Sequence, residues 1–170
     1  MLFWNIIRGR KRYVINMVLI FGICGIFNQA YSEPFPRGCE ARGFEYQDDY
    51  LMLNNTGKQA FYMIQNRNSQ VIEMQRVEMR GMFISPPLTA KIDALGWSAF
   101  ASNTPNFYFQ CFIINEDTSL PIPCLDVLEV CEYPRVRFSL SNQGNYWVSI
   151  NKSQQQIIQD AVDKGIYLKW

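Results

Sequence analysis

Cysteine is the residue type with the clearest chemistry in this chain. Cys39, Cys111, Cys124 and Cys131 follow a fifth cysteine, Cys24, which lies in an apolar N-terminal run. Their spacings of 72, 13 and 7 residues include no Cys-x-x-Cys pair, so neither a zinc cluster nor a thioredoxin-type redox pair is indicated. An even set of four instead predicts two disulfide bonds in a chain exported to an oxidising compartment.

The absence of histidine narrows the possible functions. Histidine is the commonest general base and the commonest transition-metal ligand, and the chain has none. A serine such as Ser85 or Ser98 therefore lacks its usual activating base. Asp48 and Asp49 are adjacent acids of the kind that solvated turns carry. We expect no catalytic residue, no bound metal and no cofactor.

Residues 1–32 have the three parts of a secretory signal peptide. Basic residues without any acid come first, an apolar run of 14 residues follows at 14–27, and Ala30 and Ser32 place small residues at a cleavage site. The run is shorter than the ~20 residues that a membrane-spanning helix needs. We predict a cleaved Sec-type signal, with an uncleaved membrane anchor and lipidation of Cys24 as the alternatives.

Removal of the signal changes the charge of the chain. The remaining 138 residues hold 12 basic and 15 acidic residues, a net charge of −3, whereas the whole chain carries +1. This length suits one domain with one core. No cluster of Lys and Arg stands out in the remaining sequence, so nucleic acid is not indicated as a partner. We expect a periplasmic, cell-surface or extracellular protein without a stable membrane span after cleavage.

The remaining chain has the pattern of a mostly β domain. Two prolines in residues 33–48 predict an irregular N-terminal lead-in. From residue 49 to 170, short apolar segments alternate with turn residues, which predicts an immunoglobulin-like or related β-sandwich. The expected strands are 50–53, 60–65, 71–77, 89–92, 97–101, 107–114, 122–130 and 145–150.

Alternation assigns faces to two of these strands. In 71–77 we expect Ile72 and Met74 to face the core, with Arg76 at the exit of that face. In 107–114 the odd-numbered residues form one apolar face.

The C-terminal segment changes to a helical period. Ser153 and Gln156 match a capping box, and Gly165 stands where a C′ glycine ends a helix. Apolar residues recur between them at helical spacing. We predict one amphipathic helix of about 11 residues, followed by a strand at 166–168.

The disulfide pairing depends on a predicted hairpin. If 107–114 and 122–130 pair around residue 118, Cys111 lies almost opposite Cys124. Cys39 then pairs with Cys131. The rival pairing joins Cys111 to Cys131 and Cys39 to Cys124, and the sequence alone does not choose. The hairpin favours the first.

Four aromatic residues are candidates for a binding surface. Trp97, Phe100, Tyr146 and Trp147 lie in or beside expected strands. Such residues stack on ligands in some proteins, but they more often fill a sandwich core.

Four short sequence patterns follow one another between residues 94 and 168. They are Gly96-Trp97-Ser98-Ala99-Phe100-Ala101, Phe107-x-Phe109-x-Cys111, Pro123-Cys124-x-Asp126-Val127-x-x-Val130-Cys131-x-Tyr133 and Gly144-Asn145-Tyr146-Trp147-Val148. This order resembles the enhanced-entry protein B family, small exported proteins of intracellular bacterial pathogens. The resemblance implies a periplasmic or surface location and a part in host-cell entry or virulence. It implies no reaction and no particular site residue.

These observations favour an exported, disulfide-bonded, non-catalytic interaction protein that contributes to host-cell entry or virulence. Its partner would be a protein or a component of the cell envelope. The alternative is a periplasmic accessory protein that binds a cell-wall enzyme or a glycan for envelope maintenance.

Overall fold

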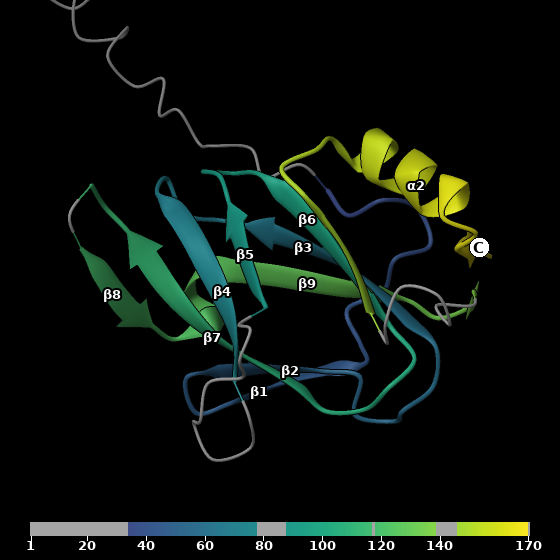
Figure 1. The fold of residues 1–170 in the computed structure, drawn as a ribbon, viewed down its shortest axis with the longest axis horizontal. Coiled ribbons are helices and arrows are strands. Elements are labelled where there is room, and N and C mark those ends of the chain that lie inside the picture. Colours follow the sequence, from purple (N-terminus) through teal and green to yellow (C-terminus); the bar gives the residue numbers. More distant parts are fainter. Residues whose placement is uncertain (1–33, 78–87, 117, 139–145, 170) are drawn as a thin grey trace, which may run out of the picture. The chain divides into compact units, whose positions relative to one another are not determined.

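The computed structural model describes residues 34–77, 88–116, 118–138 and 146–169. Antiparallel strands make up most of this part of the chain, and a helix lies near its C-terminal end (Figure 1). The predicted mostly β class, with a sandwich and one C-terminal helix, is confirmed.

The larger sheet is built around β7, and we call it the β7 sheet. Its strand order is β1-β2-β7-β4-β5, with β8 also paired to β7. Strands β2 and β8 lie on the same side of β7, β2 along residues 107–110 and β8 along residues 111–114. The strand bounds are β1 Phe44–Gln47, β2 Tyr50–Leu53, β4 Val71–Val77, β5 Thr89–Ile92, β7 Phe107–Ile114 and β8 Ser119–Ile122.

The second sheet, the β3 sheet, has the order β11-β6-β3-β9. A separate two-stranded ribbon pairs β10 with β12. The bounds are β3 Ala60–Asn66, β6 Trp97–Ser102, β9 Leu128–Tyr133, β10 Val136–Arg137, β11 Tyr146–Ile150 and β12 Tyr167–Leu168. The helices are α1 Cys124–Val127 and α2 Gln154–Asp163.

Apolar side chains are buried on both faces of the β3 sheet. Tyr62 and Ile64 of β3 join the core between the two sheets, whereas Phe61 and Met63 join a second cluster that includes Ile157 of α2. Neighbouring residues of a strand point to opposite faces, so β3 is buried along its whole length. The domain therefore has three layers, with α2 over the β3 sheet and the β3 sheet over the β7 sheet.

Both predicted strand faces are confirmed. Ile72 and Met74 are buried between the sheets. The guanidinium carbon of Arg76 lies 4.2 Å from the centre of the Phe107 ring, close enough for a cation–π contact. The odd-numbered residues of β7 also face this core.

The lead-in is shorter than predicted, because strand β1 begins at Phe44. Phe44 and Tyr46 pack against the inter-sheet core, and the residues between and after them are exposed. A turn containing Asp48, with φ at 52°, returns the chain into β2. The alternation of aromatic and polar residues is thus a strand pattern that outweighs the upstream prolines.

The predicted strand 122–130 is wrong as a single element. Strand β8 ends at Ile122, and the single-turn helix α1 follows at Cys124–Val127. Strand β9 then pairs with β3 in the other sheet. The hairpin pairs Ile114 with Ser119 and Cys111 with Ile122. A turn of helix lets the chain change sheets while it buries Cys124 and Val127 in the core between them.

The predicted start and end of α2 are confirmed. The Ser153 hydroxyl accepts a hydrogen bond from the Gln156 amide at 3.3 Å, and the Gln156 side chain accepts one from the Ser153 amide at 3.0 Å. At the other end Gly165 has φ at 75°, and the Ile166 amide donates to the Ala161 carbonyl at 2.8 Å. This is a Schellman ending, which needs the left-handed conformation that glycine adopts without strain.

Candidate interaction surfaces

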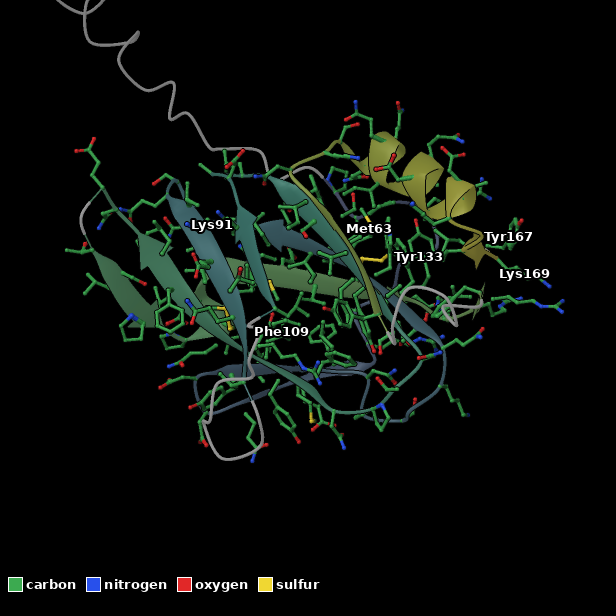
Figure 2. All side chains as sticks on the ribbon, in the orientation of Figure 1. Met63, Lys91, Phe109, Tyr133, Tyr167 and Lys169 are labelled. Atoms are coloured by element: carbon green, nitrogen blue, oxygen red, sulfur yellow. A yellow bond between two sulfur atoms is a disulfide. The ribbon has the colours of Figure 1, made fainter. Side chains whose placement is uncertain are left out.

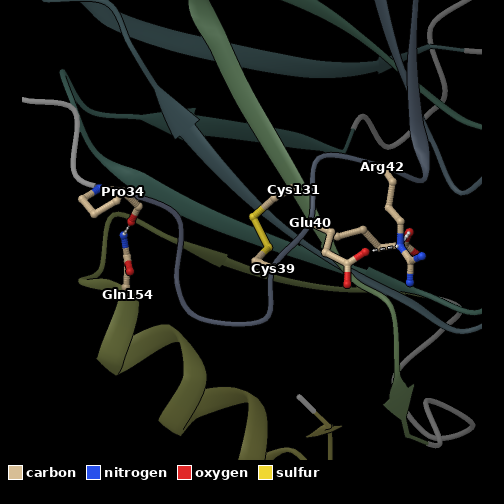
Figure 3. The surroundings of a disulfide bond; sticks show 7 residues. Pro34, Cys39, Glu40, Arg42, Cys131 and Gln154 are labelled. Carbon is tan, nitrogen blue, oxygen red and sulfur yellow. Dashed lines mark hydrogen bonds and ion pairs between the residues drawn. A yellow bond between two sulfur atoms is a disulfide. The ribbon is translucent and has the colours of Figure 1, made fainter.

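The structure contains the bonds Cys39–Cys131 and Cys111–Cys124, which is the pairing that the predicted hairpin favoured. The first ties the lead-in to β9, and the second ties β7 to the start of α1 (Figure 3 shows the first). Such bonds persist in oxidising compartments outside the cytoplasm. The chain therefore has the cross-links of a non-cytoplasmic protein.

Further contacts hold the lead-in beside the Cys39–Cys131 bond. The backbones of Glu40 and Glu132 exchange hydrogen bonds of 2.8 and 2.7 Å. The Gln154 side chain donates to the Pro34 carbonyl at 2.9 Å (Figure 3). The lead-in is thus a packed part of the domain and is attached to both β9 and α2.

A half-buried carboxylate lies next to this bond. Glu132 is within 4.0 Å of the Arg42 guanidinium, which also pairs with Glu40 at 3.3 Å. Burial raises the pKa of Glu132; Arg42 opposes this shift and Glu40 adds to it. Gly43, with φ at 74°, leaves no room for a Cβ beside the Glu132 carboxylate. This cluster joins the lead-in to β9 and offers no open site.

The raised pKa of Glu132 predicts a pH dependence of stability. Above its ordinary pKa of 4.5 and up to the raised value, the folded state binds more protons than the unfolded state. The free energy of unfolding contributed by this group therefore falls as the pH rises through that window. We expect Glu132→Gln to flatten the stability profile there, as measured by urea unfolding at a series of pH values. Glu116→Gln, at an exposed position, is the control, and an equal flattening in both variants would contradict the assignment.

The four aromatic residues considered as a binding surface do not form one. Trp97 and Trp147 are 4% and 9% exposed and lie in the cluster beneath α2. Phe100 is 3% exposed and, with the partly buried Tyr146, belongs to the core between the sheets. The two residues on β6 are three positions apart and the two on β11 are adjacent. On each strand the two side chains therefore point to opposite faces of the sheet. They fill two cores, which corrects the surface interpretation.

A serine–lysine pair that sequence reasoning missed lies at the start of α2. Ser149 and Lys152 have Ser-x-x-Lys spacing, but the Lys152 ammonium pairs with the Asp160 carboxylate at 2.5 Å. The Ser149 hydroxyl donates to the same carboxylate at 3.5 Å and its side chain is buried. An ammonium held by a carboxylate is not an activating base. The arrangement attaches α2 to β11.

The outer face of the β7 sheet is unusually apolar. The inward residues of β2, β4 and β7 belong to the inter-sheet core, so the alternate residues point outward. Their registers form three cross-strand rows: Met52–Tyr108–Val77, Tyr50–Gln110–Gln75 and Pro121–Phe112–Glu73. Neither core cluster contains any of these nine residues. We call them the outer patch.

Neither helix of the described structure covers the outer patch. The buried residues of α1 belong to the inter-sheet core, and those of α2 belong to the cluster on the β3 sheet. A sheet face turned to water normally carries polar residues. Met52, Val77 and Glu73 of the outer patch are themselves buried. Tyr50, Tyr108 and Phe112 remain partly exposed on this face. These partly exposed rings make the outer patch a candidate interaction surface in the part of the chain that the structure describes.

Comparisons with protein-family models, with curated proteins and with solved structures find no match for this chain. The resemblance to the enhanced-entry protein B family stays a prediction. Among the described residues, no group of three or more metal-binding side chains occurs. No helix in the same ranges is long and apolar enough to cross a membrane.

Proposed function

We propose that this chain is an exported, non-catalytic interaction protein that contributes to host-cell entry or virulence. It binds a protein or another component of the cell envelope through the outer patch. The observation that carries the proposal is the outer face of the β7 sheet, where Tyr50, Tyr108 and Phe112 are partly exposed and no described helix packs over them. Aromatic side chains of this kind supply much of the binding energy at protein interfaces.

The scaffold beneath the outer patch is already ordered. Strand β7 is paired on both sides and is tied to α1 by Cys111–Cys124. A rigid sheet loses little conformational freedom when a partner binds, so less of the interaction energy is spent on ordering. Disulfide cross-links and a prearranged face therefore suit a docking module.

Site-specific photo-cross-linking tests the binding face. A photoreactive residue at Gln110, in the middle of the outer patch, should form a discrete adduct in cells that export the protein. The same residue at Gln155, on the exposed side of α2, should not. Phe112→Ala should remove the Gln110 adduct. Equal adducts at both positions, or none at Gln110, would refute the outer patch as the binding face.

The biological role needs a separate experiment. Deletion should reduce uptake of the bacterium by host cells, and Phe112→Glu should fail to restore uptake where Gln155→Glu succeeds. Unchanged uptake after a clean deletion would refute the role in host-cell entry. It would not refute the outer patch as a binding face, which could then serve a different role.

A periplasmic accessory role is the second candidate. The row Tyr50–Gln110–Gln75 sets an aromatic ring beside two amides, which suits a sugar, whose ring is apolar on its faces and whose hydroxyls need hydrogen-bond partners. Protease added to intact cells separates the two roles. A surface protein is cleaved, and a periplasmic one is protected.

A further inference from the structure

The ribbon of β10 and β12 brings together basic residues that are some thirty positions apart in the sequence. Arg137 lies opposite Tyr167 in the ladder, and Val136 lies opposite Leu168. The Lys169 amide donates to the Arg135 carbonyl at 2.8 Å, so the register continues by one more pair. Arg135 therefore lies across the ribbon from Lys169.

One face of this ribbon is packed and the other is open. Val136 and Leu168 pack against the cluster beneath α2. The pairs on either side, Arg137–Tyr167 and Arg135–Lys169, point to the opposite face because neighbouring residues of a strand alternate. All four of these residues are exposed, Tyr167 to 56%. Figure 2 shows Tyr167 and Lys169 at the periphery of the domain, near the C-terminal end of α2. We call Arg135, Arg137, Tyr167 and Lys169 the basic ribbon face.

Within the described ranges, no ion pair joins a cation of the basic ribbon face to an acidic side chain. The ion pairs of the described residues use Arg42, Arg67, Lys91 and Lys152 as their cations. Lys164, also exposed, adds a further positive charge just before β12.

Acids close to the ribbon in the sequence already have partners. Glu132, three residues before Arg135, lies 4.0 Å from the Arg42 guanidinium. Asp160 is paired with Lys152 at 2.5 Å, and Asp163 accepts a hydrogen bond from Gln159 at 2.9 Å. Like charges directly opposite each other on paired strands repel, as Arg135 and Lys169 must. The repulsion is relieved when an anion lies between them.

We propose that the basic ribbon face docks the domain onto the phosphate groups of an anionic lipid surface. One guanidinium group can donate hydrogen bonds to two oxygens of the same phosphate, and lysine adds a further positive charge. The face is a two-stranded ribbon on the exterior of the domain, which suits a plane carrying many phosphates. The exposed Tyr167 presents the amphipathic ring that is enriched at membrane interfaces.

The disulfide bonds favour a lipid surface over nucleic acid. Disulfides place the chain outside the cytoplasm, where envelope lipids present phosphate. The domain is otherwise acidic, with a net charge of −3 after the predicted cleavage. The contact is therefore local to the ribbon and is separate from the outer patch.

Vesicle sedimentation with the oxidised, exported protein tests the proposal. We expect binding to phosphatidylcholine vesicles that contain phosphatidylglycerol, no binding to pure phosphatidylcholine, and weaker binding as salt is added. Each basic residue near an anionic surface contributes about a fivefold factor in affinity. The double variant Arg137→Gln/Lys169→Gln should therefore bind about 25-fold more weakly.

The matched control removes the same two residue types elsewhere. Arg37 and Lys58 are exposed and take no part in the ion pairs of the described residues. Arg37→Gln/Lys58→Gln should leave vesicle binding unchanged, and the circular dichroism of both double variants should match that of the unmodified protein. An equal loss in both, no dependence on phosphatidylglycerol, or tighter binding to a DNA duplex than to vesicles would overturn the proposal.

Discussion

Replacing Cys39 and Cys131 with alanine is expected to lower the free energy of unfolding by about 4.5 kcal/mol, against about 3 kcal/mol for Cys111 and Cys124. The difference arises because the first bond spans 92 residues of sequence and the second spans 13. A longer loop removes more conformational freedom from the unfolded chain.

The loop closed by Cys111–Cys124 lies inside the loop closed by Cys39–Cys131, so the shorter loop must be taken into account when the two losses of stability are compared. With Cys111–Cys124 intact, the loop closed by Cys39–Cys131 still contains about 80 residues, so its expected contribution hardly changes. Guanidinium unfolding of both double alanine variants, made as oxidised proteins, measures the two losses. Equal losses, or a larger loss for Cys111–Cys124, would show that unfolded-state entropy does not govern the role of these bonds.

Phe109→Ala is expected to cost about 4 kcal/mol, whereas Phe112→Ala should cost less than about 1 kcal/mol. Both residues lie on β7, three positions apart, so they point to opposite faces. Phe109 is 2% exposed, and its ring centre lies 5.5 Å from that of Phe100 across the sandwich. Phe112 is only partly buried, in the outer patch. Truncation therefore leaves a cavity only at Phe109.

The same two variants separate stability from binding. Phe112→Ala should unfold at nearly the denaturant concentration of the unmodified protein and still lose the cross-link from Gln110. Phe109→Ala should shift the unfolding midpoint strongly. If Phe112→Ala destabilises the domain as much as Phe109→Ala, the face assigned to the outer patch is a core face and the proposed binding surface fails.

The elements that the sequence predicted well have strong local patterns. Alternation in 107–114 identifies the inward face of β7, and the Ser153–Gln156 capping box locates the start of α2. Segment 122–130 failed because an apolar run does not show which sheet each half joins, and one turn of helix at α1 divides it. The strand Phe44–Gln47 was not predicted, because Pro34 and Pro36 favour an irregular segment and four alternating residues are a weak strand pattern.

The candidate surfaces were harder to predict than the disulfides. The favoured cysteine pairing needs only one hairpin, and a small error in its centre still leaves Cys111 near Cys124. Whether Trp97 is exposed or buried depends on α2, which covers the second face of the β3 sheet. The outer patch and the basic ribbon face depend on registers between distant segments. No single segment contains their pattern.

Mass spectrometry of the protein recovered through its native export route shows whether the leader is removed and whether both disulfide bonds form. We expect a chain that begins after residue 32, without free thiols, and non-reduced peptides that link Cys39 to Cys131 and Cys111 to Cys124. Four free thiols, or a chain that still carries its N-terminal leader, would contradict this expectation.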